Sequence, residues 1–299
     1  ECIKVDYIMQ ALIITAYHDY SKLERNLKLY SKGFNCYVHI DANSKEFDEQ
    51  KIAKLNEIDN VYVISKYKIL WGSYLHMMAI IELIEEALKN KDNTFFHIIS
   101  GDDFPTKDYN EYYNFFEKDG KKYNYLEVTD ISDMPVMQKR YKIFHFMHIL
   151  NRRSGHKSVI LLDKCLRHIQ YHLPIKRKRV FNYKGLVWCS LTREAAEYTV
   201  NTVRNNGDIK VLKYCEIAEE FLFSNTLLES KQFRDTVIWD KKRLTIWENE
   251  HSTGPRELDI NDLKQIRESD CYFARKIIYN ENNHELYDSL YSKFEKSLL

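Results

Sequence analysis

The sequence has few of the residues that mark linkers and disordered segments. Only four Pro and eight Gly occur among its 299 residues, and we find no low-complexity segment and no internal repeat. Disordered chains are also poor in apolar residues, whereas 44% of this chain is hydrophobic. The composition therefore excludes a linker-rich chain and predicts a globular protein of one large domain or two modest ones.

An excess of charge of one sign is also lacking. Lys and Arg number 45 and Asp and Glu number 44, so the formal net charge is +1. Proteins that bind nucleic acid usually carry a basic excess, because contacts to phosphate dominate their affinity. We therefore expect no nucleic-acid partner.

The six cysteines lie far apart, and no two have the C-x-x-C spacing of zinc and thioredoxin-like motifs. We expect most of them to be reduced and buried as small apolar side chains. No apolar run reaches the roughly 18 residues of a membrane span, and no basic signal peptide opens the chain. We therefore expect a cytoplasmic protein. Met9 is the expected natural start, and residues 1–8 are then an added leader or a misassigned start.

Several catalytic motifs are absent as well. The sequence has no G-x-G-x-x-G, no G-x-x-x-x-G-K-[ST] and no G-x-S-x-G, so dinucleotide-binding, P-loop and α/β-hydrolase functions are unsupported. No two Asp are spaced i, i+2, which removes the Asp-x-Asp metal motif of many nucleotide-sugar transferases. The adjacent side chains of Asp102 and Asp103 diverge if the segment is extended. We predict no metal site.

Short apolar runs and helical patterns alternate through the first hundred residues. Strands are expected at 10–17, 34–41, 61–65 and 95–100, and helices at 20–32 and 71–90. This order predicts an α/β fold with a doubly wound, mostly parallel mixed sheet flanked by helices. Ligands of such sheets bind at the carboxyl ends of the strands, which here carry TAYHD, HIDANS, SKYKILWGS and SGDDFP.

The remainder divides into two parts. Residues 139–180 are rich in Lys, Arg and His, including KRKR at 176–179, and predict a solvated helical insertion. A surface that faces an anionic glycan or lipid phosphate is the alternative. From 181 the α/β pattern resumes, with helices expected at 193–206, 261–270 and 280–299 and strands at 237–240, 244–249 and 271–279. We expect one domain over 9–299, with 9–135 as its nucleotide-binding half and 181–299 as its acceptor and catalytic half.

Six segments, taken in order, carry a resemblance to a known family. They are YVHIDANS, WGSYLHMMAIIELIEEAL, FFHIISGDDFPTK, GLVWCSLTREAAEYTV, AEEFLFSNTL and YFARKI. In this order they resemble the core 2 and I-branching β-1,6-N-acetylglucosaminyltransferase family, which includes peptide O-xylosyltransferases. The resemblance implies a GT-A-type fold, a UDP-sugar donor, and inverting chemistry without a metal or other cofactor.

Glu219 and Glu220 open an apolar run. Inversion is a single displacement, so one base must take the acceptor proton, which is worth about 10²–10⁴-fold in rate. In the family the second acid is that base, here Glu220. Glu219 replaces the usual Asp and would orient the base or contact the acceptor. Without the resemblance, a pair that complements a helix dipole, worth about 0.3–1 kcal/mol, is favoured.

Arg275 and Lys276 follow a buried-looking Tyr-Phe-Ala. The leaving UDP develops negative charge, which a guanidinium fork and an ammonium can neutralise. The family makes this pair the diphosphate clamp, and Arg256 is a further candidate cation. The alternative is an ordinary solvated basic pair after a strand.

The nucleoside is expected at the first strand ends. Asp41 would accept from uracil or ribose, and Ala16, Tyr17 and His18 would form the floor of the pocket. The alternative for Asp41 is a turn cap. An aromatic wall is expected from Trp71, which is nearly as well explained as a core residue. Asp103 would touch the donor sugar or, as we favour, hold a loop by accepting from backbone N–H groups.

The sugar is expected beside Trp188, because aromatic faces suit pyranose C–H surfaces. Val187 stands where relatives have a polar residue, and we count Val187, Trp188 and Glu219 as acceptor-binding. Eukaryotic relatives carry a membrane anchor and disulfides, and this sequence shows neither. It therefore resembles bacterial members that build surface polysaccharide in the cytoplasm, with peripheral contact at the inner membrane as a further expectation.

The expected reaction moves a sugar, first of all GlcNAc, from its UDP donor to a glycan or lipid-linked glycan. UDP-xylose, UDP-galactose and UDP-glucuronate are the alternatives within this class. Two rival functions stay open. One is a catalytically silent carbohydrate- or nucleotide-binding module, and the other is a metal-dependent phosphoesterase that uses Asp102, Asp103 and nearby His.

Overall fold

The structure is a computed structural model of the chain. It describes residues 9–119, 121–173, 177, 181–205, 211–249, 252, 254–281 and 283–298. The expectation for residues 1–8, and that for the basic run 176–179 apart from Arg177, lie outside these ranges.

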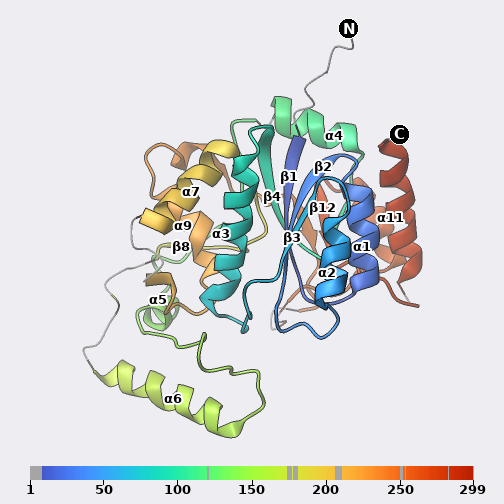
Figure 1. Cartoon of the computed structure of the whole chain (residues 1–299). Coiled ribbons are helices and arrows are strands. Elements are labelled where there is room, and N and C mark those ends of the chain that lie inside the picture. Colours follow the sequence, from blue (N-terminus) through green and yellow to red (C-terminus); the bar gives the residue numbers. More distant parts are fainter. Residues whose placement is uncertain are drawn as a thin grey trace.

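A seven-stranded sheet forms the centre of the fold (Figure 1). Its order is β10-β6-β9-β4-β1-β2-β3. The members are β1 (Met9–Ala16), β2 (Phe34–Ile40), β3 (Val61–Ile64), β4 (Asn93–Ser100), β6 (Asn124–Tyr125), β9 (Ser190–Thr192) and β10 (Val237–Ile238). β4, β1, β2 and β3 are parallel neighbours, and β9 runs antiparallel to β4 and β6. The predicted mostly parallel mixed sheet is confirmed.

Two small sheets lie beside the large one. One has the order β11 (Arg243–Thr245), β12 (Phe273–Arg275) and β5 (Asp103–Pro105), and the other pairs β7 (Thr129–Asp130) with β8 (Tyr183–Lys184). In the first, β12 and β5 are antiparallel and Arg275 stands opposite Asp103. The pairing brings two predicted site segments together across about 170 residues of chain.

Helices cover both faces of the large sheet (Figure 1). One layer holds α3 (Tyr74–Lys89), α7 (Arg193–Asn205) and α9 (Glu219–Leu228). The other holds α1 (Tyr20–Tyr30), α2 (Glu49–Asn56) and α11 (His284–Ser297). This arrangement confirms the doubly wound architecture.

Further helical elements lie in the described part of the chain. They are α4 (Tyr109–Tyr113), the π-helix Asn114–Asp119, α5 (Pro135–Tyr141), α6 (Lys157–His172), the 3-10 turns Arg234–Thr236 and Ile260–Asp262, and α10 (Leu263–Glu268). Asp259 caps the Ile260–Asp262 turn, with its side chain accepting from the N–H of Asn261. The helix expected from 71 begins at Tyr74, because Gly72 has a φ of 74° that only glycine adopts without strain.

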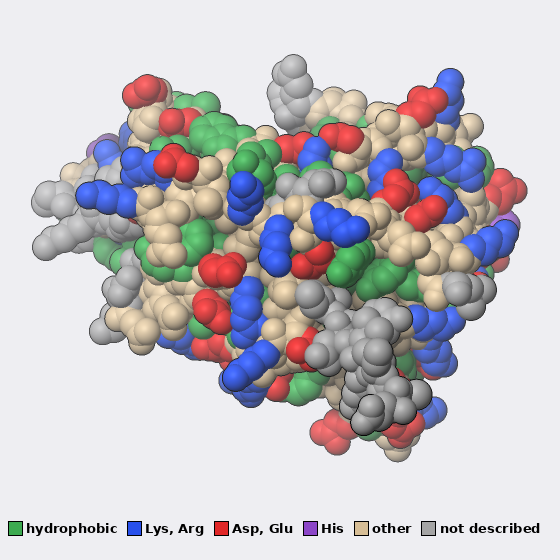
Figure 2. Space-filling model, turned by 90° about the horizontal axis from the view of Figure 1, so that it is seen from above, with side chains coloured by type: hydrophobic (Ala, Val, Ile, Leu, Met, Phe, Trp, Pro, Cys, Tyr) green, Lys and Arg blue, Asp and Glu red, His purple; other side chains and the backbone are tan. Residues whose placement is uncertain are grey.

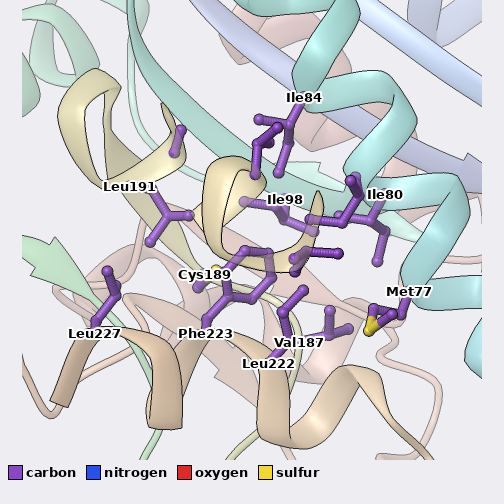
Figure 3. Close-up of a cluster of buried hydrophobic side chains, with 14 of the residues drawn as sticks. Met77, Ile80, Ile84, Ile98, Val187, Cys189, Leu191, Leu222, Phe223 and Leu227 are labelled. Carbon is purple, nitrogen blue, oxygen red and sulfur yellow. The ribbon is translucent and has the colours of Figure 1, made fainter. Parts of the chain in front are cut away.

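The layer of α3 and α9 shares one apolar core with the sheet. Figure 3 shows side chains of both helices converging on those of β4 and the segment before β9. The labelled members are Met77, Ile80, Ile84, Ile98, Val187, Cys189, Leu191, Leu222, Phe223 and Leu227. Eight of the ten residues of α9 are buried, and they include Glu219 in its first turn.

Charge is evenly mixed on the end of the molecule opposite α6. Figure 2 shows Lys and Arg side chains interspersed with Asp and Glu over that face. Among the described cysteines, Cys36, Cys189 and Cys215 are buried, Cys271 is half-buried and Cys165 is exposed. The expectation that most cysteines are buried is confirmed for this part of the chain.

Candidate functional site

Two adjoining cavities lie where the strand ends meet the first turn of α9. The larger has a volume of about 1200 Å³ and the smaller about 420 Å³. They are continuous, since they share lining residues from several elements. These shared residues are Tyr17, Trp71, His76, Arg153, Trp188, Glu219 and Arg275.

Most of the predicted site residues line these cavities. Ala16, His18 and Asp41 line the smaller cavity only, and Val187, Glu220 and Lys276 line the larger only. Tyr17, Trp71, Trp188, Glu219 and Arg275 line both. Asp103 lines neither. The structure therefore brings together side chains that the sequence distributes over more than 250 residues.

Glu220 lies in the first turn of α9 and faces the larger cavity. Its Oε2 atom is 3.0 Å from Nζ of Lys184 at the end of β8. Burial raises the pKa of the Glu220 carboxyl, and the Lys184 ammonium opposes this rise only in part. A carboxylate with a raised pKa is a better proton acceptor than an ordinary surface glutamate.

Glu219 is buried and borders both cavities. Its Oε1 atom is 3.0 Å from Nδ1 of His76, and Nε2 of His76 is 3.2 Å from Oγ1 of Thr15. Oε2 of Glu219 has no hydrogen-bond partner within the described ranges. A chain of contacts thus runs from the end of β1 to α9, and the other carboxylate oxygen of Glu219 is buried without a partner in the described ranges.

Arg275 is fixed by a buried carboxylate. Its Nη1 atom is 3.0 Å from Oδ2 of Asp103 and also contacts the hydroxyl of Ser100. Oδ2 of Asp103 accepts from the backbone N–H of Ser100 at 2.6 Å. The guanidinium carbon of Arg275 lies 4.7 Å from the centre of the Trp188 ring, a cation–π contact. Asp103 therefore holds the loop and orients Arg275, as favoured from the sequence.

Three further cations border the larger cavity. Lys276 is half-buried, and its ammonium has no ion pair with any residue that the structure describes. Arg256 makes a two-pronged contact to Asp262, at 2.6 and 2.8 Å. Arg153 stacks over Trp71, 4.0 Å from its ring centre. Trp71 is 42% exposed, which excludes the alternative of a core tryptophan.

Asp102 and Asp103 diverge as expected. Asp102 lies 3.0 Å from Nζ of the buried Lys22 and 3.2 Å from Nε2 of His18. Burial opposes ionisation of Asp102, but these two partners hold its pKa well below the usual range. No group of three or more His, Cys, Asp or Glu side chains suited to a metal ion occurs in the described part of the chain.

Two residues predicted to contact a ligand also stabilise the fold. Oδ1 of Asp41 accepts from the backbone N–H groups of Asn43 and Ile69, at 2.9 and 3.0 Å, as a turn-capping Asp does. Val187 is 5% exposed and packs in the core of α3 and α9. Both still border a cavity, and their roles as ligand contacts stay predictions.

Sequence reasoning missed three residues of the site. They are His76, Lys184 and Arg153. His76 sits two positions into α3, inside the WGSYLH segment, and Lys184 directly precedes GLVW, so proximity to known motifs was an available signal for both. Arg153 lies in the basic segment 139–180, and its stacking on Trp71 has no signal in the sequence.

Comparisons with known proteins give a family and distant relatives. The family model described as Core-2/I-Branching enzyme matches residues 11–267. The beta-glucuronosyltransferase GlcAT14A of Arabidopsis thaliana is 21% identical over 267 residues, which cover 84% of this chain and 56% of that protein. The chain thus spans about half the length of this curated relative.

Solved structures offer only remote likenesses. Mouse xyloside xylosyltransferase 1 in its apo form has a TM-score of 0.37 and 10% identity, over 89% of this chain and 96% of that one. A glycosyltransferase involved in the glycosylation of the major capsid of PBCV-1 has a TM-score of 0.35 and 8% identity, over 94% and 98%. At these scores neither structure carries any conclusion about this chain.

Proposed function

Because the chain belongs to the Core-2/I-branching enzyme family, a family of glycosyltransferases, we propose that it moves a sugar from a UDP-sugar to a glycan hydroxyl with inversion. GlcNAc is the proposed sugar. UDP-glucuronate, UDP-xylose and UDP-galactose are the alternative donors, and the name of the Arabidopsis thaliana relative keeps glucuronate among them. The acceptor is a glycan or lipid-linked glycan, and the proposed setting is bacterial surface polysaccharide synthesis.

Glu220 acts as the base in this proposal. The acceptor oxygen attacks C1 of the donor sugar while the bond from C1 to the UDP oxygen breaks. The proton of the acceptor hydroxyl passes to the Glu220 carboxylate, and the pair of electrons of the broken bond leaves with UDP. The raised pKa of Glu220 and its position on the wall of the larger cavity support this role.

Arg275 and Lys276 neutralise the departing diphosphate in this proposal. Arg275 is held by Asp103 and Trp188 before any substrate arrives, which is the preorganisation that electrostatic stabilisation requires. Lys276 has no competing ion pair within the described residues, so its charge is available. We propose that these cations make a metal unnecessary, a view that the lack of Asp-x-Asp in the sequence also supports.

The smaller cavity is the proposed nucleoside site. It is bordered by Ala16, Tyr17, His18 and Asp41 at the carboxyl ends of β1 and β2. Ligands of parallel α/β sheets bind at this end of the strands. Glu219 lines both cavities, and in this proposal it contacts the acceptor or orients the base.

The observation that carries the proposal is the shared cavity of Glu220 and Lys276. The test is a UDP-release assay over the four candidate UDP-sugars and a panel of glycan acceptors, with EDTA present. We expect turnover in EDTA with one donor, and a loss of about 10²–10⁴-fold in Glu220→Gln with donor binding preserved. Turnover that requires added Mg²⁺ or Mn²⁺ would overturn the metal-free mechanism.

A catalytically silent binding module is the rival function. It predicts donor binding with no UDP release by the unaltered protein with any acceptor, and no effect of Glu220→Gln. The family gives no support to a metal-dependent phosphoesterase, and Asp102 and Asp103 are both engaged by cations of the chain. Activity retained in EDTA would eliminate that reading as well.

A further inference from the structure

Helix α6 leaves several of its apolar residues exposed, although the two residues that it buries are polar. Leu161, Leu162 and Ile169 have exposed fractions of 63%, 49% and 51%. The buried residues of the helix are Asp163 and Gln170. A surface helix of a globular protein normally buries its apolar stripe. Packing within the chain therefore leaves part of the apolar surface of α6 uncovered.

Polar contacts hold the helix in this orientation. Asp163 pairs with Nε of Arg167 at 3.0 Å and with Arg152 at 3.6 Å. The amide of Gln170 accepts from the N–H of Phe144 at 2.7 Å and donates to its carbonyl at 2.9 Å. These contacts give the two buried polar side chains of α6 their partners. The side of the helix that carries Asp163 and Gln170 therefore faces the rest of the chain, and the apolar stripe is exposed.

Basic residues lie along one edge of the apolar stripe. At 100° per residue, Leu161, Leu162, Cys165, Ile169 and Leu173 fall within one sector, which also contains His172. Lys157, Lys164 and His168 lie along one edge of this sector. Residues 139–173 contain eight Lys and Arg and a single acidic residue, Asp163, which is buried and paired. Figure 1 shows the helix set apart from the two helix layers.

We propose that α6 is a membrane-surface helix, which lays its apolar stripe into the headgroup region of an anionic bilayer. A helix with an apolar face and a basic rim binds such a surface by burial of apolar area and by attraction to anionic lipid. A second copy of the chain is a poorer occupant, because residues 139–173 of the two copies, each with eight Lys and Arg and one acidic residue, would repel each other. No helix within the described residues is long and apolar enough to cross a bilayer.

The active-site cavity and this helix are joined by a short segment. Arg153, which stacks on Trp71 and borders both cavities, precedes the start of α6 at Lys157 by four residues. Binding of α6 to lipid would hold this edge of the cavities near the membrane surface.

The test is flotation of the full chain with vesicles. Vesicles of phosphatidylcholine mixed with phosphatidylglycerol are compared with vesicles of phosphatidylcholine alone, at about 0.1 M and about 1 M salt, where screening lengths are about 10 and 3 Å. We expect binding to the anionic vesicles, little to the neutral ones, and weaker binding at high salt. Absence of binding to anionic vesicles at low salt would overturn the proposal.

The variant Leu162→Glu with Ile169→Glu separates α6 from other causes of binding. This double variant should lower the partition coefficient onto anionic vesicles at least about tenfold, because two apolar side chains that would be buried in the bilayer are replaced by charged ones. Lys54→Glu on α2 changes the net charge by the same amount and should bind nearly as well as the unaltered chain. Thermal unfolding of both variants checks the fold. Equal binding by all three proteins, or a dimer that the double variant breaks without any vesicle binding, would refute the assignment.

Discussion

Lys184 and Glu220 form an ion pair at the wall of the larger cavity, with Nζ of the lysine 3.0 Å from Oε2 of the glutamate. The next residue, Gly185, donates its N–H to the carbonyl of Glu220 at 2.9 Å. A Cβ on Gly185 would lie 1.9 Å from the carbonyl oxygen of Glu127, so no other residue fits there without a shift of backbone. This close approach fixes the end of β8 against the first turn of α9 and sets the position of the ion pair.

The ion pair leads to a pH prediction. The Lys184 ammonium favours the ionised form of Glu220, against the effect of burial, so Lys184→Met should raise the pKa of Glu220 further. The base then stays protonated to a higher pH. The acid limb of the pH profile of kcat/KM should therefore shift to higher pH, with a several-fold loss of activity on the acid side. Lys184→Arg should keep the limb near its original position. A limb that Lys184→Met leaves in place would show that Glu220 is not the titrating base.

A second prediction concerns His76, which links Thr15 to Glu219. His76→Ala removes both contacts and frees the Glu219 carboxylate, and errors in position of about 1 Å can cost about 10²-fold in rate. We expect a fall of about 10- to 100-fold in kcat with a smaller change in the KM for the donor. His76→Asn, whose amide nitrogen can occupy the place of Nδ1, should recover part of the loss. If both variants lose activity equally, loss of the contact between His76 and Glu219 does not explain the fall in kcat.

The sequence predicted the layers of the fold but not the local orientation of its side chains. Strands such as β1 and β4 are long, apolar and bounded by polar residues, and helix α3 has a clear apolar stripe, so both could be located. In contrast, β9 and β12 have three residues each, and only their pairing with β4 and β5 defines them. Short strands carry too little periodicity to be assigned without their neighbours.

For the site, the family motifs gave the acids and cations but not their partners. The pairing of Arg275 with Asp103 comes from the register of β12 against β5, which a linear pattern does not contain. The contact of Arg153 with Trp71 depends on how the segment before α6 folds back. A solvated helix was expected in the segment of α6, but the exposure of its apolar residues was not, since an apolar stripe alone suggests a buried side.

Arg275 and Lys276 should differ in what their loss does. Arg275→Met leaves the carboxylate of Asp103, whose side chain is fully buried, without its cation. We expect a loss of about 3–5 kcal/mol in the free energy of unfolding together with a loss of activity. Lys276→Met breaks no ion pair within the described residues, so its stability should change by less than about 0.5 kcal/mol while kcat falls.

Urea unfolding and UDP-release kinetics on both variants measure this split. A Lys276→Met variant with unaltered kcat would remove Lys276 from the proposed clamp. If Arg275→Met and Lys276→Met lower the free energy of unfolding equally, Arg275 is not the residue that compensates the buried charge of Asp103.

The last prediction concerns the buried pair of Lys22 and Asp102, whose atoms lie 3.0 Å apart. Asp102→Asn leaves the ammonium of Lys22, 2% exposed, without a counter-charge, and should cost about 3–5 kcal/mol of stability at neutral pH. The double change of Asp102→Asn and Lys22→Met should cost less, because no unpaired charge is then buried. Equal unfolding free energies for the single and double variants would contradict this account.

The same pair predicts a pH dependence. The pKa of Asp102 is lower in the folded chain than in the unfolded one, because Lys22 and His18 outweigh the opposing effect of burial. Its contribution to stability is therefore fully present above the unfolded pKa and is lost as the pH falls from there through the folded pKa. Unfolding in urea from neutral to acid pH should show the unaltered chain losing its advantage over Asp102→Asn as acid is added. A constant difference between the two proteins across that range would mean that the ionised form of Asp102 is not what stabilises the fold.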